Sequence, residues 1–387
     1  MRRVAIVGIG NSRFGKRLDV NVAELAFESI RQAINDAGVD RKDIGNVTVG
    51  SLGSWYEEPL PAVIVNEYAG LLSVGTMRVE AACATGSAAV RSAYLSVASG
   101  ETDVALAVGV EKMTEVETPT AVELMGRAGS YLWEFENYGM TFPAYYALHA
   151  VSHMNRFGTT EEDLARVAVK AHHYGSLNPL AHFQKEISLE RALTSPVVAW
   201  PLKLFDASPI TDGSAAVVVA SEDVAKKLSD TPVWIKAIGV SSDSANLSRR
   251  EDYVGLSATV EASRRAYALA KCTPQDVDVT DLHDCFTIAE IMAYEDLGFC
   301  KKGEGAELLR EGQTELGGSH PVNLDGGLKA KGHPIGATGV SMMVEISKQL
   351  RGDAGSHQAR IKNGIGMAHN VGGTGHYCYV TILSRSA

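Results

Sequence analysis

A cysteine placed between a strand and a helix is the first residue of this sequence whose position suggests chemistry. Cys83 follows an apolar strand predicted over Arg78–Ala81 and precedes a helix of small residues that continues through Ala88–Ala98. At a helix N-terminus, the macrodipole and the unpaired N–H groups favour a thiolate. A thiolate is the nucleophile that acyl transfer requires. The alternative is a buried structural cysteine in a core rich in alanine and glycine, and the spacing alone leaves both readings open.

A second group of reactive side chains follows another predicted strand. His283-Asp284-Cys285-Phe286 comes directly after the apolar run Val277–Leu282. Ligands of α/β proteins bind at the carboxyl ends of strands, so an imidazole, a carboxyl and a thiol at this point suggest a site. The alternative, which the residues favour equally, is a polar strand end with Asp284 as the N-cap of the next helix.

Two glycine-rich segments complete the set of candidates. Gly326–Gly339 precedes a helix and could cradle a phosphate or a pantetheine arm, although it lacks the Lys-Ser or Lys-Thr ending of a nucleotide loop. Within it, His333 is fixed by Pro334 and could orient or deprotonate a thiol, although a lone histidine in such a loop is more often structural. His369–Gly375 follows the apolar run Ile365–Ala368, and its glycine N–H groups are natural donors to an oxyanion.

The elements that must position these residues alternate between strands and helices. Apolar strands are predicted at Arg3–Gly8, Asn46–Gly50 and Val104–Val110, and an amphipathic helix is predicted over Val22–Ala37. Continuous apolar runs of this length are typical of strands covered on both faces. The alternation predicts an α/β protein with a mainly parallel sheet and right-handed crossovers.

The same pattern returns in the second part of the chain, after a helical insertion. Arg31–Gly50 aligns with Arg264–His283 with four identities in twenty positions, and the strand–helix order around the two segments is the same. Internal duplication is therefore plausible, with a site between two similar halves. We expect an N-terminal half over residues 1–114 and 202–230, an inserted loop domain over 115–201, and a C-terminal half over 231–387.

Composition excludes several classes of protein. The chain has 387 residues with 36 basic and 46 acidic side chains, a net charge of −10, which argues against binding to nucleic acid or to an anionic membrane. No run reaches the ~18 apolar residues of a membrane span. Five cysteines are few and odd in number, so we expect a reducing cytoplasm rather than a disulfide framework. His149 and His153 have helical metal-ligand spacing but no evident third ligand, so we expect no metal.

Together, these segments resemble the thiolase family over essentially the whole chain, from Arg3 to Ile382. Glu80–Ser87 matches the family's nucleophile motif, Thr211–Ala215 is a family-like turn, and Gly332-His333-Pro334 is highly characteristic. The resemblance implies the thiolase fold, an α/β fold of two duplicated halves in a five-layer αβαβα arrangement with a helical loop domain.

The sequence departs from the bacterial biosynthetic thiolases in a way that indicates which members of the family it resembles. Those enzymes carry Asn-Glu-Ala-Phe where this chain has His283–Phe286, and a second cysteine where this chain has Asn370. The pattern is similar to that of sterol-carrier-protein-type thiolases and archaeal acetoacetyl-CoA thiolases. In those families the cysteine of the His-Asp-Cys-Phe motif supplies the acid/base thiol, and Cys285 inherits that role by resemblance.

The activity implied by the resemblance is that of an acetyl-CoA C-acetyltransferase. It condenses two acetyl-CoA molecules to acetoacetyl-CoA and CoA, or runs in reverse, with CoA thioesters as substrates and no permanently bound cofactor. Cys83 would carry the acyl group after His333 takes its proton, and Cys285 would remove an α-proton. His283 would stabilise the enolate oxygen, and the N–H groups of Cys83 and Gly372 the thioester oxyanion. The expected substrate contacts are Met140, Phe286, His369 and Asn370.

The resemblance also implies partners. Thiolases of this type form dimers or tetramers, and archaeal members resemble components of a complex with HMG-CoA synthase, bridged by a small zinc-ribbon/OB-fold protein. Such a complex would feed the mevalonate pathway. The alternatives are a degradative 3-ketoacyl-CoA thiolase for longer or branched chains, a retro-aldol enzyme, and a non-catalytic acyl-CoA-binding scaffold. The presence of Cys83, Cys285 and His333 together favours a true thiolase.

Overall fold

A nine-stranded sheet runs through the protein and divides into two halves. The computed structural model describes residues 2–387. The strand order is β3-β2-β4-β7-β1-β8-β11-β10-β9. The two central strands β1 and β8 meet over only two residue pairs, Ala5–Trp234 and Ile6–Val233. The strands are β1 (Val4–Asn11), β2 (Asn46–Gly50), β3 (Gly75–Val79), β4 (Val104–Lys112), β7 (Asp212–Ser221), β8 (Val233–Ser242), β9 (Val279–Leu282), β10 (Ile365–Gly372) and β11 (Tyr377–Ser384).

Each half repeats the same order and pairing of elements. The first strand, β1 or β8, pairs antiparallel with the last strand of its half, β7 or β11. That strand pairs antiparallel with β4 or β10, which in turn pairs parallel with β2 or β9. The helix that follows the first strand is α1 (Val22–Ala37) in one half and α9 (Ser257–Ala270) in the other. This repeat confirms the two duplicated α/β halves.

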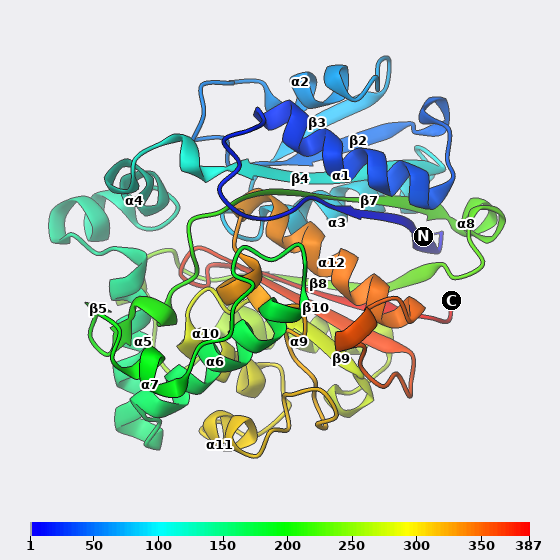
Figure 1. The fold of residues 1–387 in the computed structure, drawn as a ribbon. Helices are drawn as coiled ribbons and strands as arrows, with labels where there is room; N and C mark the ends of the chain where they lie inside the picture. Colours follow the sequence, from blue (N-terminus) through cyan, green and yellow to red (C-terminus); the bar gives the residue numbers. More distant parts are fainter. Residues whose placement is uncertain (1) are drawn as a thin grey trace.

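The helices and the two half-sheets form five layers (Figure 1). Helices α1 and α2 (Pro61–Tyr68) cover the outer face of the N-terminal half, and α9 covers the outer face of the C-terminal half. Helices α3 (Thr85–Ser99) and α12 (Ile335–Arg351) lie between the half-sheets and contact strands of the interior. The remaining helices outside the insertion are α8 (Glu222–Leu228), α10 (Thr287–Asp296) and α11 (Gly305–Arg310).

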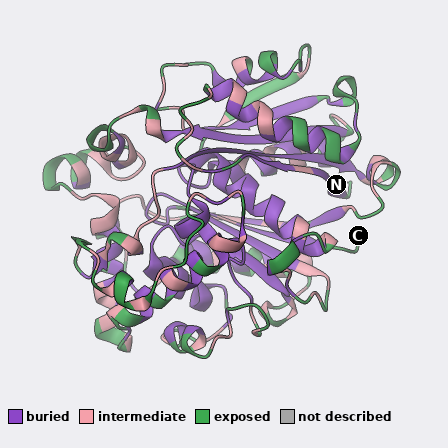
Figure 2. Cartoon of the chain, viewed as in Figure 1, coloured by how far each residue is buried: buried purple, intermediate pink, exposed green. Residues whose placement is uncertain are grey.

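The expectation of a mainly parallel sheet is wrong. Five of the eight pairings in the large sheet are antiparallel, and only three are parallel. Strands β4 and β7 are buried along their whole length and pair antiparallel. Figure 2 shows this burial continuing through the central strands and α12. The apolar runs arise because helices cover both faces of these strands, and that burial does not depend on strand direction.

Close contact between α3 and α12 fixes the place of the site. A Cβ on Gly86 would lie 2.6 Å from the Gly339 nitrogen, and a Cβ on Gly109 would lie 2.2 Å from the Gly336 oxygen. Only glycine allows backbones to approach so closely. Cys83 lies two residues before α3, and His333 lies two residues before α12. The packing of the two helices therefore brings the cysteine and the histidine together.

The insertion between β4 and β7 is mostly helical and lies to one side of the sheet (Figure 1). Its helices are α4 (Thr118–Gly126), α5 (Phe142–Phe157), α6 (Glu161–Leu177) and α7 (Leu189–Leu193), with a small hairpin of β5 (Val197–Ala199) and β6 (Leu202–Lys203). Helices α5 and α6 pack against α10, which follows the His283–Phe286 segment. The exact boundaries of the three segments stay a prediction. Within residues 2–387, the helices are all too short or too polar to cross a membrane.

Candidate active site

The turn between β3 and α3 presents Cys83 to an internal cavity. Ala82 has a positive φ of 49°, which is strained for a residue other than glycine. Thr85 stabilises the turn, because its Oγ1 donates to the Ala82 oxygen at 2.6 Å and accepts the Ala81 N–H at 2.9 Å. Cys83 is 9% exposed. A strained turn held in this way aims the cysteine side chain at a fixed point.

The thiol of Cys83 is protonated at rest, contrary to the effect expected from the helix N-terminus. Burial raises the pKa of Cys83 to about 12, although the Gly373 N–H that points at the thiol lowers it in part. Desolvation of the thiolate therefore outweighs the backbone N–H groups of Gly373 and Cys83 that favour it. A nucleophilic role for Cys83 would need a base that takes this proton when substrate is bound.

His333 is oriented to be that base. The Thr338 hydroxyl donates its only proton to the Pro334 oxygen at 3.0 Å, so it accepts from His333 Nδ1 at 2.7 Å. The Nε2 atom then carries the lone pair, and it is buried without a hydrogen-bond partner. Burial lowers the pKa of His333 to about 3, so the imidazole is neutral. Thr338, which fixes this tautomer, was not found from the sequence, where it reads as an ordinary helix residue.

His283 has the opposite tautomer. The Asn370 amide nitrogen donates to the Cys83 oxygen at 3.0 Å and lies 3.1 Å from His283 Nδ1. Because an amide NH₂ group only donates, His283 Nδ1 is an acceptor and Nε2 carries the proton. That N–H is buried and unpartnered. Burial, with His333 and His369 nearby, lowers the pKa of His283 well below its usual value.

These groups converge on one point. Cys83, His283 and His333 each place a potential ligand atom within 4.8 Å of the others. The two imidazole rings are 5.0 Å apart and nearly perpendicular, at 83°. The site thus combines a thiol, a lone pair that can accept its proton, and an N–H that can donate to a developing negative oxygen.

Cys285 faces the same cavity from the strand–helix turn after β9. Its backbone oxygen accepts the Ser208 N–H at 2.9 Å, which joins the turn to the segment after the insertion. Burial and the nearby Cys83 raise the pKa of the Cys285 thiol. The cavity has a volume of about 330 Å³. It is lined by Cys83, Cys285, Phe286, His333, Gly373, Ser208 and Thr141, and by the apolar side chains Met113, Val122, Met125, Ala128, Phe142, Pro143, Val198, Ala207, Pro209, Ile210 and Ile335.

Other predicted substrate contacts lie elsewhere. Met140 lines a separate hollow with Trp133 and Tyr138, although its neighbours Thr141 and Phe142 line the cysteine cavity. His369 is directed to the opposite face of β10 from Asn370, where its Nε2 lies 3.1 Å from Thr259 Oγ1. Asn370 is fully buried, and it contacts the Cys83 turn and does not line the cavity.

The glycines after β10 contact the nucleophile turn. A Cβ on Gly372 would lie 2.3 Å from the Ala81 oxygen, so its backbone packs directly on that turn. The neighbouring Gly373 lines the cavity and was not singled out from the sequence. The role of the Gly372 N–H as an oxyanion donor stays a prediction.

The paired histidines of α5 bind separate partners. His149 Nδ1 lies 2.6 Å from the Tyr253 oxygen, and His153 contacts Thr159 and Glu295. These contacts make both residues part of the packing of α5. Among residues 2–387, converging metal-ligand atoms occur in the Cys83, His283 and His333 group.

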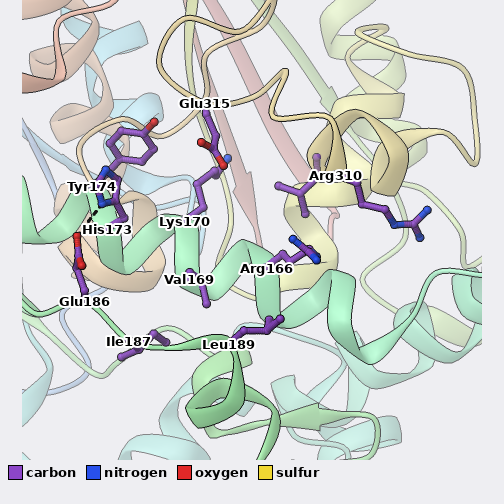
Figure 3. A pocket seen from close by; sticks show the side chains of 11 residues that line it. Arg166, Val169, Lys170, His173, Tyr174, Glu186, Ile187, Leu189, Arg310 and Glu315 are labelled. Atoms are coloured by element: carbon purple, nitrogen blue, oxygen red, sulfur yellow. Dashed lines mark hydrogen bonds and ion pairs between the residues drawn. The ribbon is translucent and has the colours of Figure 1, made fainter.

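A charged hollow of about 380 Å³ lies beside α6 (Figure 3) and shares no lining residue with the cysteine cavity. Three of its ionic side chains have partners: Lys170 contacts Glu290 at 2.5 Å, Arg310 contacts Asp163 at 2.6 Å, and His173 contacts Glu186 at 2.8 Å. Paired charges of this kind are typical of structural networks, so the hollow is no candidate for the chemistry.

Comparison with known proteins identifies the family of the chain. Residues 4–223 match the family model for the thiolase N-terminal domain, and residues 239–385 match the model for the thiolase C-terminal domain-like family. The chain is 44% identical over 387 residues to an acetyl-CoA acetyltransferase of Methanothermobacter thermautotrophicus, with 100% of both chains covered. It is 41% identical over 392 residues to an acetyl-CoA acetyltransferase of Methanocaldococcus jannaschii, with 99% of both covered. The solved structure named Ltp2-ChsH2(DUF35) aldolase aligns with a TM-score of 0.86 at 25% identity, covering 100% of this chain and 98% of that one.

The thiolase domains and the acetyl-CoA acetyltransferase relatives show that the chain is an acyltransferase. The chain belongs to the thiolase family, whose members use CoA thioesters as substrates.

Proposed function

We propose that this protein is an acetoacetyl-CoA thiolase that condenses two acetyl-CoA molecules reversibly. The proposal is supported above all by the apolar cavity that Cys83, Cys285 and His333 line together, with His283 converging on Cys83 and His333. The acetyl-CoA acetyltransferases at 44% and 41% identity support acetyl-CoA as the substrate.

In the first half-reaction, Cys83 Sγ attacks the thioester carbonyl of acetyl-CoA while its proton passes to His333 Nε2. The N–H groups of Cys83 and Gly372 stabilise the oxyanion of the tetrahedral intermediate. One such donor typically contributes ~10²–10³ in rate. The intermediate collapses to acetyl-Cys83, and the proton on His333 leaves with CoA as its thiol.

In the second half-reaction, Cys285 passes its own proton to His333 Nε2 and, as a thiolate, removes an α-proton from a second acetyl-CoA. The His283 N–H, fixed by Asn370, donates to the enolate oxygen. The carbanion then attacks acetyl-Cys83, which forms the new carbon–carbon bond and releases the Cys83 thiolate, and this thiolate takes the proton from His333. The products are acetoacetyl-CoA and the free enzyme. Phe286 lines the cavity and is our candidate contact for the pantetheine arm, and Met140 would contact substrate farther out, in the neighbouring hollow.

We infer that the chain acts as a homodimer or tetramer. Strand β3 lies at the edge of the sheet, so its outer N–H and C=O groups are unpaired and can join another strand. Exposed apolar side chains gather on this edge and on α2 beside it: Leu60, Val63, Tyr68, Leu72 and Met77. Patches of this kind support association between subunits.

The cellular location, the metabolic pathway and the partner proteins are also proposals. We infer a cytoplasmic enzyme that supplies acetoacetyl-CoA to HMG-CoA synthase in the mevalonate pathway, with a zinc-ribbon/OB-fold protein as a bridge. The named second component of the Ltp2-ChsH2(DUF35) neighbour supports a search for such a partner. Removing the product in a complex would favour the otherwise unfavourable condensation.

The solved structure named as an aldolase supports a second candidate function, retro-aldol cleavage, which needs no acyl-enzyme. Incubation of the purified chain with acetoacetyl-CoA, with and without free CoA, separates the two. A thiolase consumes acetoacetyl-CoA only when CoA is present and yields two acetyl-CoA. Loss without CoA would instead indicate hydrolysis, and a retro-aldol enzyme would leave acetoacetyl-CoA intact, because this substrate has no β-hydroxyl group to cleave. Either result would contradict the proposal. Cys285→Ser should keep the acetylation of Cys83 and lose condensation.

A further inference from the structure

Tyr146 is a buried polar residue that the mechanism above does not use. It lies on α5, is fully buried, and its hydroxyl has no hydrogen-bond partner within the described chain. A buried hydroxyl without a partner destabilises the folded state, because it loses its hydrogen bonds to water on burial and forms none in the protein. Its ring stacks on Phe286, with centroids 4.6 Å apart and planes 23° apart. The tyrosine is therefore held against the residue that follows Cys285.

Tyr146 and Cys285 each shift the pKa of the other: Tyr146 lowers the pKa of the Cys285 thiol, and Cys285 raises that of the Tyr146 phenol. The other groups that act on Cys285 are Cys83 and Asp284, which disfavour its thiolate, and the Phe286 N–H, which favours it. The buried Lys329 ammonium also interacts with Cys285. Tyr146 is thus the one side chain with a hydroxyl among the groups that shift the pKa of this thiol.

Burial and the nearby Cys285 raise the pKa of Tyr146 well above its usual value, and the cation Arg250 offsets this only in part. The phenol therefore keeps its proton at any pH at which the enzyme works, and it remains a donor. When Cys285 loses its own proton, the sulfur becomes a strong acceptor, and hydrogen bonds to a charged group are stronger than neutral ones.

We propose that Tyr146 is a positioning residue for the condensation step, whose hydroxyl donates to Cys285 Sγ while that atom is a thiolate. This inference rests on the proposed function, because it assigns Tyr146 to the base of the second half-reaction. The step is a proton transfer: the α-carbon of acetyl-CoA gives its proton to Cys285, the thiol re-forms, and the Tyr146 hydrogen bond is released. Acetylation of Cys83 does not involve it.

The test is the rate of Cys285 alkylation by iodoacetamide from pH 7 to 10, measured on a Cys83→Ala background and located by mass spectrometry. Tyr146→Phe keeps the ring and its stacking on Phe286. Because the lost bond is to a charged group, we expect alkylation to be roughly tenfold slower at each pH, a displacement of about one pH unit. The matched control is Tyr145→Phe, which removes a buried and unpartnered hydroxyl from the adjacent residue.

Cys378 serves as an internal reporter of folding, because it is fully buried in β11. Slow labelling of Cys378 in every variant would show that the core stays closed. Equal Cys285 profiles in Tyr146→Phe and Tyr145→Phe would overturn the proposal, and so would faster labelling in Tyr146→Phe with Cys378 still protected. This experiment can succeed or fail independently of the proposed function, because a chain that never cleaves acetoacetyl-CoA can still show slower alkylation of Cys285 in Tyr146→Phe. On the Cys83-containing chain, Tyr146→Phe should slow thiolysis and leave Cys83 acetylation intact.

Discussion

Replacing Asn370 by aspartate should reverse the tautomer of His283. The amide nitrogen now donates to the Cys83 oxygen and towards His283 Nδ1, at 3.0 and 3.1 Å. A carboxylate of the same shape can only accept, so His283 Nδ1 must carry the proton. The Nε2 atom then holds a lone pair and cannot donate to the enolate oxygen. Asn370→Asp therefore removes one specific donor from the second half-reaction.

The expected loss is that of one oxyanion donor, about 10²–10³ in the condensation rate. This loss of rate should depend on pH, and it should be smaller at low pH. The introduced carboxylate would raise the pKa of His283, which burial now holds far below its usual value. Below that raised pKa, His283 is an imidazolium and Nε2 regains its proton. The deficit of Asn370→Asp should therefore be largest at pH 8–9 and shrink towards pH 6.

The assay is the thiolysis of acetoacetyl-CoA from pH 6 to 9 for the native chain, Asn370→Asp and Asn370→Ala. Alanine removes the donor without adding an acceptor, so its deficit should not shrink on acidification. Acetylation of Cys83 by acetyl-CoA, followed by mass spectrometry, should change less than thiolysis in both variants. An Asn370→Asp enzyme as active as the native one at pH 8, or with a deficit independent of pH, would refute the tautomer argument.

Three further predictions concern the same region. At pH 8, Zn²⁺ should inhibit Asn370→Asp more strongly than the native enzyme, and a chelator should restore the activity. The reason is that the carboxylate would turn His283 Nε2 into a metal ligand beside Cys83 and His333. Equal sensitivity of the two enzymes to Zn²⁺ would contradict this. Since burial raises the pKa of Cys83 to about 12, its alkylation in the free enzyme should be slow at pH 7 and rise about tenfold per pH unit to pH 10; a plateau near pH 8 would show a lower pKa. Gly86→Ala should destabilise the fold by about 1–3 kcal/mol and lower the melting temperature, because its Cβ would lie 2.6 Å from the Gly339 nitrogen. The control is Gly129→Ala, whose Cβ would have its nearest atom 3.6 Å away and which should change the melting temperature little. Equal melting temperatures for the two variants would contradict the close packing of α3 on α12.

Much of the fold could be predicted from local sequence. The helix predicted over Val22–Ala37 has those bounds, because Asn21 forms a capping box at its start and Gly38 adopts the left-handed conformation at its end. The strand predicted over Asn46–Gly50 also matches. Strand direction was predicted wrongly, since an apolar run records burial on both faces and carries no sign of which way its neighbour runs.

The site was predicted in part. Strand and helix ends indicated Cys83, Cys285 and His333, and the cavity brings these three together. What could not be predicted are contacts across the chain: Asn370 meets Cys83 over 287 positions of sequence, and nothing local to either residue signals it. Thr338 and Tyr146 lie inside regular helices, where a hydroxyl has no distinguishing pattern. His369 was expected at the substrate, but alternation along β10 directs it to the face opposite Asn370.

The central claim is that Cys83 carries the acyl group. The most direct measurement is mass spectrometry of the native chain after incubation with acetyl-CoA alone, followed by digestion to locate the modification. We expect one acetyl group on Cys83, discharged when free CoA is added and absent from Cys83→Ala. A chain that remains unmodified, or that carries the acetyl group on Cys285, would contradict it.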